Sequence, residues 1–300
     1  MEDRALGRSG ARTSGKAVDV VQGRGCGGTE GPTLDDVLDL EQVEQNLFRS
    51  TLTYPDAWAL YGGQVAAQGL LAAGRTVDGA RSPHSLHCYF LRRGSATRPT
   101  VFRVERDRDG RSFSARRVVA VQGGEVVCSM SCSFTTGGAG PDLQVRPAPR
   151  SQHPEALPPI TLARLFSMDT RLPEQPCPDS ARPTRLWGRA TVPLPDDPTV
   201  HAAVLTYFSD IISGTSALEG ARDRTNTSID HAVWFHRPLR LDDWVLMDLV
   251  PHTMAAARGW YTGTVHDASG RLGASLTQEV LVRPRVRKAS RTRSQERGSA

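Results

Sequence analysis

The stretch Leu272-Gly-Ala-Ser-Leu-Thr-Gln-Glu-Val-Leu-Val282 carries an apolar residue at every even position except 278. An alternation with a period of two is typical of a strand with one buried face, so Gln278 is predicted to point inward. A buried amide without hydrogen-bond partners costs about 1–3 kcal/mol. Gln278 therefore predicts polar partners in the core. We expect these partners to be Asp210 and Ser228, the latter within Asn226-Thr-Ser-Ile-Asp-His-Ala-Val-Trp-Phe-His236.

The chain contains a weak internal repeat. The segment 84–93 lies 144 residues before 228–237, and this alignment sets His87 over His231. An apolar stretch with helical character precedes each copy, at about 63–77 and about 199–213. The order is therefore a helix followed by several strands, twice, which indicates a duplicated α+β unit.

A second pair of segments extends the repeat. The segment 124–134 lies 146 residues before 270–280, and this alignment sets Cys132 in the place of Gln278. The inward residues predicted for the first of these strands are Val126, Cys128, Met130, Cys132 and Phe134. The second copy alone is therefore expected to carry a polar inward residue.

The domain boundaries follow from composition. We expect two units, at 34–136 and 186–283, since 300 residues are enough for two packed cores. Ten of the twenty prolines lie in the segment 137–185, which predicts an extended linker without helix or central strand. The segments 1–33 and 284–300 have no apolar period and are expected to be disordered tails.

The positive charge is concentrated at the carboxyl end. Residues 283–300 hold seven Lys or Arg and one Glu, a net charge of 7 − 1 = +6, whereas the whole chain carries +5. The rest of the chain therefore sums to 5 − 6 = −1. No aromatic residue interleaves with the basic ones, so we expect a solvated tail and no nucleic-acid partner.

The cysteines and the hydropathy indicate a reducing, aqueous setting. The five cysteines lack the paired spacing of a metal site, so neither a metal nor a disulfide is expected. No apolar run is long enough to span a bilayer, and no apolar leader opens the chain. We expect a soluble, cytoplasmic protein that has no membrane partner.

Several short motifs resemble, in order, those of the acyl-CoA thioesterase II family, the double-hotdog thioesterases. They are Leu47-Phe-Arg49, Tyr61-Gly-Gly-Gln64, His84-Ser-Leu-His-Cys-Tyr-Phe-Leu91, Arg108-Asp-Gly-Arg-Ser-Phe113, Tyr207-Phe-Ser-Asp210, Ser228-Ile-Asp-His231 with Trp234-Phe-His236, and Gln278-Glu279. The resemblance covers about 34–283. Tyr61 departs from it, because the family usually has Phe there.

The resemblance implies a fold and an activity. The fold would be α+β, a double hotdog: two antiparallel sheets, each wrapped round a central helix, joined into one continuous sheet. The activity would be hydrolysis of fatty acyl-CoA to a free fatty acid and CoA, without a cofactor, by a homo-oligomer (dimer or tetramer). In this family an Asp, a Thr or Ser and a Gln order the attacking water, and Asp210, Ser228 and Gln278 occupy the matching positions.

The chemistry of these residue types supports such roles. Hydrolysis of a thioester requires an oriented water, a base for its proton and donors for the developing oxyanion. Asp210 can be the base, while Ser228 and Gln278 can fix the water. The candidate substrate-binding residues are Gly62, Gly63, Gln64 and Arg111. The glycines allow an acyl group to approach the backbone closely, and Arg111 is a candidate for the CoA phosphates, with a structural role in a hairpin as the alternative.

Each candidate has a purely structural alternative. An Asp late in a helix is usually solvated, and a Ser beside a strand usually serves a turn. His231 and His236 are interpreted as packing residues, and Asp230 as a structural carboxylate. Two other functions remain open, a non-catalytic acyl-CoA-binding hotdog protein and a hotdog enoyl-CoA hydratase. The hydratase would require an Asp and His pair in place of the Asp, Ser and Gln set.

Overall fold

The computed structural model describes residues 31–56, 59–180, 182–218, 221 and 224–284. The tails predicted at 1–33 and 284–300 lie outside this range, apart from residues 31–33 and 284. None of the helices in the described part of the chain is both long and apolar enough to cross a membrane.

The helices of the described residues are few compared with the strands. They are α1 (Leu34–Leu38), α2 (Gly62–Gly74), α3 (Pro198–Ser209) and the 3₁₀ turns η1 (Pro154–Ala156) and η2 (Gly214–Ala217). The first half contributes the strands β1 (Leu40–Glu44), β2 (Leu47–Ser50), β3 (Ser82–Phe90), β4 (Val101–Asp109), β5 (Phe113–Gln122) and β6 (Glu125–Thr135). The rest are β7 (Pro159–Ile160), β8 (Met168–Arg171), β9 (Arg185–Ala190), β10 (Arg224–Ser228), β11 (Asp230–Phe235), β12 (Val245–Ala255), β13 (Arg258–Asp267) and β14 (Leu272–Pro284).

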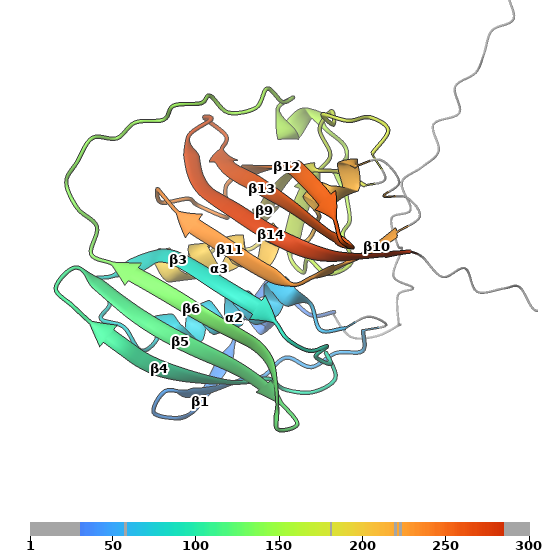
Figure 1. Ribbon diagram of the computed structural model, residues 1–300. Helices are drawn as coiled ribbons and strands as arrows, with labels where there is room; N and C mark the ends of the chain where they lie inside the picture. Colours follow the sequence, from blue (N-terminus) through green and yellow to red (C-terminus); the bar gives the residue numbers. More distant parts are fainter. Residues whose placement is uncertain (1–30, 57–58, 181, 219–220, 222–223, 285–300) are drawn as a thin grey trace, which may run out of the picture.

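All of these strands belong to one antiparallel sheet (Figure 1). Its order is β1-β2-β4-β5-β6-β3-β11-β14-β13-β12-β9-β8-β7, with β10 also paired to β14. The two halves join where β3 pairs with β11, and Cys88 there lies opposite His231. The strands at the join are the two copies of the repeated segment. The expected double-hotdog architecture is confirmed.

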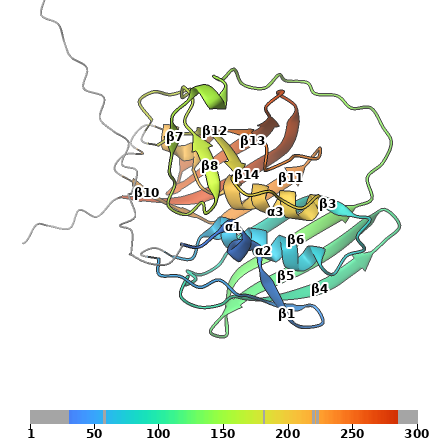
Figure 2. The same cartoon turned by 180° about the vertical axis from the view of Figure 1, so that it is seen from behind.

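The helices α2 and α3 pack against each other on one face of the sheet (Figure 2). They run antiparallel, and glycines of α2 allow a close approach at both ends. A Cβ at Gly63 would lie 2.6 Å from the Tyr207 carbonyl oxygen, and a Cβ at Gly74 would lie 2.6 Å from Cγ2 of Thr199. The start of α2 is thereby fixed beside the end of α3.

The two helices begin differently. Asp197 caps α3, since its side chain accepts the Thr199 N–H at 2.7 Å, and Pro198 occupies the first helical position. The start of α3 lies within one residue of the apolar stretch expected from about 199. Tyr61 precedes α2 and offers no side-chain cap. The first N–H groups of a helix have no partner within the helix, so the N–H groups at the Gly62-Gly63 end of α2 remain available to a ligand.

Two details of the repeat differ from expectation. The alignment of His87 with His231 is wrong by one residue, because His87 is exposed whereas His231 is fully buried. A shift of one residue moves a side chain to the other face of a sheet. In β6, Val127 is buried in place of Val126, because a β-bulge inserts one residue opposite Ala120 and Val121.

The Pro-rich segment 137–185 contains η1, β7 and β8, and its strands extend the sheet at the edge beyond β9. It also contacts the first half of the chain. Arg164 forms an ion pair with Asp56 at 2.9 Å and donates to the Ala59 carbonyl at 2.8 Å. The segment therefore ties the two halves together near the start of α2.

Candidate active site

Asp210 is the centre of a compact polar cluster at the end of α3. It follows the last helical residue as the C-cap and is half-buried. Its Oδ1 accepts a hydrogen bond from Gln278 Nε2 at 2.6 Å and one from Ser228 Oγ at 3.3 Å. The structure therefore brings together the three residues that the sequence proposed as a unit.

Each member of the cluster is positioned by its own element. Gln278 lies on the inward face of β14 and is 1% exposed, as its alternation predicted. Ser228 is the last residue of β10 and pairs with Val280 of β14. Helix α3 ends beneath these strands, so three chain segments converge on one carboxylate.

The first half of the chain completes the site. A Cβ at Gly62 would lie 2.7 Å from Asp210 Oδ2 and 2.9 Å from the Phe90 ring, so only glycine fits between them. No hydrogen bond to Oδ2 is formed by the residues that the structure describes. This oxygen faces the uncapped start of α2, where the helix dipole favours negative charge.

Two further buried groups touch the cluster. The Tyr261 hydroxyl donates to Gln278 Oε1. His231 Nε2 lies 2.8 Å from Ser209 Oγ, whose own hydrogen is donated to the Thr206 carbonyl at 3.0 Å. The imidazole therefore carries its proton on Nε2. Its Nδ1 has no partner among the described residues.

Burial controls the ionisation of these neighbours. Burial raises the pKa of the Tyr61 and Tyr261 phenols well above the ordinary range, and the nearby Asp210 carboxylate adds to the shift. Burial also lowers the pKa of His231, a shift that Asp210 partly opposes. All three side chains are therefore neutral near pH 7, and no Lys or Arg among the described residues forms an ion pair with Asp210.

The remaining candidates differ in position. Gly63 follows Gly62 in the first turn of α2, and Gln64 is buried there with its Oε1 accepting from the Tyr54 hydroxyl at 3.2 Å. Arg111 is elsewhere. It lies in the turn between β4 and β5, against the carboxyl end of α2. Helix α2 has 13 residues and each adds about 1.5 Å along the axis, so its carboxyl end lies about 20 Å from Gly62.

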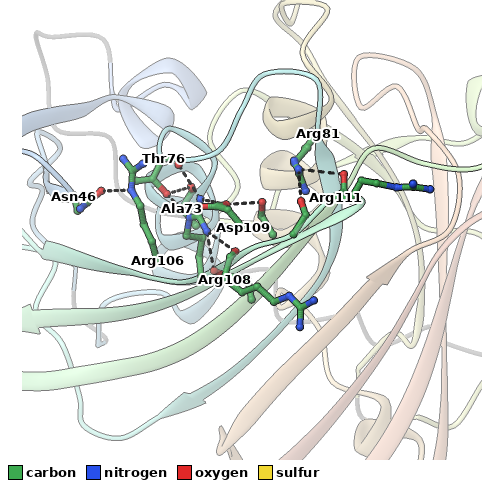
Figure 3. A network of polar contacts seen from close by, with 12 residues as sticks. Asn46, Ala73, Thr76, Arg81, Arg106, Arg108, Asp109 and Arg111 are labelled. Atoms are coloured by element: carbon green, nitrogen blue, oxygen red, sulfur yellow. Dashed lines mark hydrogen bonds and ion pairs between the residues drawn. The ribbon is translucent and has the colours of Figure 1, made fainter.

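A buried arginine anchors the Arg111 turn. Arg116 is 1% exposed and donates to the Thr76 hydroxyl at 2.8 Å, the Arg108 carbonyl at 3.0 Å and Asp109 Oδ1 at 2.7 Å. Figure 3 shows the side chain of Arg111 directed away from this network. The contact of Arg111 with its neighbours there is through its backbone carbonyl, which accepts a hydrogen bond from Arg81. The geometry of the turn supports the structural role and does not bring Arg111 to the Asp210 cluster.

The first half has no equivalent cluster. Arg75 is the C-cap of α2, in the position that Asp210 holds after α3. The offset of 144 residues between the repeated strands does not carry Asp210 to this position, because the connections from helix to strand differ in length between the halves. Cys132 holds the place of Gln278 and is buried. The described residues therefore contain one such carboxylate cluster.

Tyr261 was not predicted from the sequence, and His231 was assigned to packing only. A signal for Tyr261 was available, since a tyrosine on the inward face of β13 needs a partner for its hydroxyl. The described residues include no group of three or more His, Cys, Asp or Glu side chains that could hold a metal ion.

Comparisons with known proteins identify the family of this chain. The acyl-CoA thioesterase N-terminal domain matches residues 53–135, and the acyl-CoA thioesterase C-terminal domain matches residues 141–282. Human acyl-coenzyme A thioesterase 8 is 31% identical, over 87% of this chain and 94% of its own length. Acyl-CoA thioesterase 2 of Haemophilus influenzae is 29% identical, over 82% of this chain and 96% of its own.

Solved structures show the same similarity. The acyl-CoA thioesterase II TesB2 of Mycobacterium marinum is 40% identical with a TM-score of 0.72, over 83% of this chain and 96% of its own. A tesB protein of Mycobacterium avium is 33% identical with a TM-score of 0.74, over 84% and 100% of the two chains. The family domains and these relatives span both halves of the fold, and the chain belongs to the acyl-CoA thioesterase II family.

Proposed function

We propose that this chain hydrolyses fatty acyl-CoA to a free fatty acid and CoA, with Asp210, Ser228 and Gln278 as the catalytic residues. One observation supports this site above the others: Oδ1 of Asp210 is held by two neutral donors while Oδ2 faces the start of α2. A carboxylate in this state has one oxygen fixed and the other available as a base.

The chemical steps need no further group. A water next to Asp210 Oδ2 gives its proton to that oxygen while its own oxygen attacks the thioester carbon. Ser228 and Gln278 fix the carboxylate, and their remaining hydrogen-bonding capacity orients the water. The tetrahedral intermediate then breaks its carbon–sulfur bond, and the proton held by Asp210 passes to the departing thiolate. This transfer regenerates the Asp210 carboxylate, and the free acid then leaves.

The negative charge of the intermediate needs donors beside it. The uncapped start of α2 supplies backbone N–H groups, and the absence of a side chain at Gly62 lets Asp210 lie directly beside them. Gln64 completes this first turn. We assign the oxyanion site to these N–H groups, so each active site uses a helix from one half and a carboxylate from the other.

The cellular setting belongs to the same proposal. Unpaired thiols at Cys88, Cys128, Cys132 and Cys177 support a reducing compartment such as the cytoplasm. The substrate class supports a role in fatty acid metabolism. In the described part of the chain α2 and α3 lie on one face of the sheet (Figure 2), and the opposite face supports association of chains into a dimer or tetramer. Sedimentation at micromolar concentration tests this last part.

Release of free thiol from a fatty acyl-CoA, followed with a thiol reagent, tests the activity. The full chain should release one thiol for each thioester consumed. Binding of a non-hydrolysable acyl-CoA without thiol release would identify a binding protein instead. Loss of the double bond of an enoyl-CoA, without thiol release, would identify a hydratase.

A further inference from the structure

Tyr261 lies on β13 directly opposite Gln278 of β14. Its side chain is fully buried, and its hydroxyl donates to Gln278 Oε1. Burial, followed by the nearby Asp210 carboxylate, raises the pKa of this phenol well above its ordinary value. The hydroxyl therefore keeps its proton near neutral pH, and it remains a hydrogen-bond donor there.

The Gln278 amide has two chemically different ends. In the structure, the oxygen faces the Tyr261 hydroxyl and the nitrogen faces Asp210 Oδ1 at 2.6 Å. If the amide rotated by a half turn, its oxygen would face the carboxylate, and two acceptors would meet without a hydrogen between them. The carboxylate alone favours the observed orientation. The phenol adds a second preference, because a turned amide would leave its hydrogen only the Ile212 carbonyl, 3.4 Å away, and this preference remains when Asp210 becomes protonated.

We propose that Tyr261 is a positioning residue of the active site, whose hydroxyl holds the Gln278 amide with its nitrogen toward Asp210. This inference rests on the proposed catalytic role of Gln278. When Asp210 takes the proton from water, its attraction for the amide nitrogen weakens, and Tyr261 keeps the amide from turning at that moment. The effect of the hydroxyl therefore appears in kcat, and substrate affinity changes little.

The phenol ring is itself held in place. A Cβ at Gly214 would lie 2.6–2.8 Å from the Cγ, Cβ and Cδ2 atoms of Tyr261, so the 3₁₀ turn η2 packs directly on the ring. The Ile212 carbonyl lies 3.4 Å from the hydroxyl on the same side. Since the backbone on one side and Gln278 on the other confine the ring, the hydroxyl has a fixed direction.

The first test is a double-mutant cycle in the full chain with Tyr261→Phe and Gln278→Ala. The phenylalanine keeps the ring and removes only the hydroxyl. We expect kcat to fall about tenfold in Tyr261→Phe, as for one lost hydrogen bond, with KM within about twofold of wild type. In the Gln278→Ala background the same change should lower kcat by less than about twofold, because the amide it positions is absent.

A second variant displaces the hydroxyl without removing it. Gly214→Ala pushes the Tyr261 ring aside, so kcat should again fall. In the Gln278→Ala background the same change should lower kcat much less. Gly273→Ala is the matched control. Its Cβ would meet Leu239 at 2.2 Å, a comparable clash on β14 away from the cluster, so it should lower the melting temperature and leave kcat within about twofold of wild type.

The outcomes separate the inference from the proposed site. If Gln278→Ala lowers kcat strongly but neither Tyr261→Phe nor Gly214→Ala does, the positioning role is overturned and the site stands. If their effects multiply fully with that of Gln278→Ala, Tyr261 acts by another route and the inference is also overturned. If Gln278→Ala keeps full activity, both the site and the inference are wrong.

Discussion

Gly62 of the first half lies against Asp210 of the second, so closely that a Cβ at position 62 would come within 2.7 Å of the carboxylate Oδ2. The two residues are far apart in the sequence and belong to different copies of the repeat. Their contact exists because α2 and α3 run antiparallel, which sets the start of one helix beside the end of the other. The candidate site therefore depends on how the two halves join.

The first prediction concerns this contact. Gly62→Ala places a methyl group between the backbone and Asp210, so the carboxylate or the start of α2 must move. We expect kcat to fall by at least about tenfold, because a shift of about 1 Å at a catalytic group is enough for such a loss. Steady-state thiol release measures it.

A matched control lies in the same helix. Gly69→Ala makes the same change, but its Cβ meets only the flexible end of Met130, at 2.4 Å from Cε. That variant should keep kcat within about twofold of wild type. Equal activity of the two variants would contradict the placement of the site at the start of α2.

The second prediction concerns Arg116, whose guanidinium is buried and donates to Thr76, Arg108, Ala115 and Asp109. Arg116→Met leaves the buried hydroxyl and carbonyl of Thr76 and two part-buried carbonyls without this donor, so we expect a loss of about 3 kcal/mol in the free energy of unfolding. Urea unfolding measures this loss. Arg117→Met, at an exposed neighbour, should change stability little.

Activity distinguishes anchoring from substrate binding in the same region. The Arg111 turn lies far from Asp210, so folded Arg111→Ala protein should keep its KM for acyl-CoA. A KM raised tenfold or more in Arg111→Ala would mean that this turn reaches the CoA group of a substrate.

The third prediction concerns pH. Burial lowers the pKa of His201, His231 and His266 below the value of about 6.5 found in unfolded chains. On acidification the unfolded chain therefore takes up protons first. The stability contributed by these neutral histidines is fully present above about pH 6.5 and is lost as the pH falls below it.

The urea concentration at the unfolding midpoint should accordingly decrease when the pH is lowered from 7.5 to 5.5. His201 offers a control, because its Nδ1 accepts the Leu241 N–H at 3.1 Å and the side-chain oxygen of Asn can replace that acceptor without titrating. His201→Asn should reduce the dependence on pH. A midpoint that is independent of pH in the wild-type protein would contradict this account.

Much of the fold follows from local pattern. The alternation in 272–282 placed Gln278 inward, and the apolar stretch expected at about 199–213 begins within one residue of α3, because strand faces and helical character depend on residues close in sequence. The pattern failed at Val126, where a β-bulge moves the buried position to Val127. A bulge depends on the partner strand, which the local alternation does not contain.

The site was predictable only in part. Asp210, Ser228 and Gln278 were found from the motifs. The requirement of an inward Gln for hydrogen-bond partners led to the same three residues. The contacts of Gly62 and Tyr261 with this cluster were not foreseen, because they depend on the join between the halves and on the register of β13 against β14. Such relations between distant segments are set by tertiary packing.

The central claim is that Asp210, Ser228 and Gln278 orient one water as a unit, and Asp210→Asn tests it most directly. Asparagine keeps the shape of the side chain but cannot take the proton of the water. We expect kcat for thiol release to fall by about 10²–10³, with little change in substrate affinity and near-native stability. Combining Asp210→Asn with Gln278→Ala should cost far less than the product of the two single losses. Retention of most activity by Asp210→Asn at neutral pH, or full multiplication of the two losses, would contradict the account.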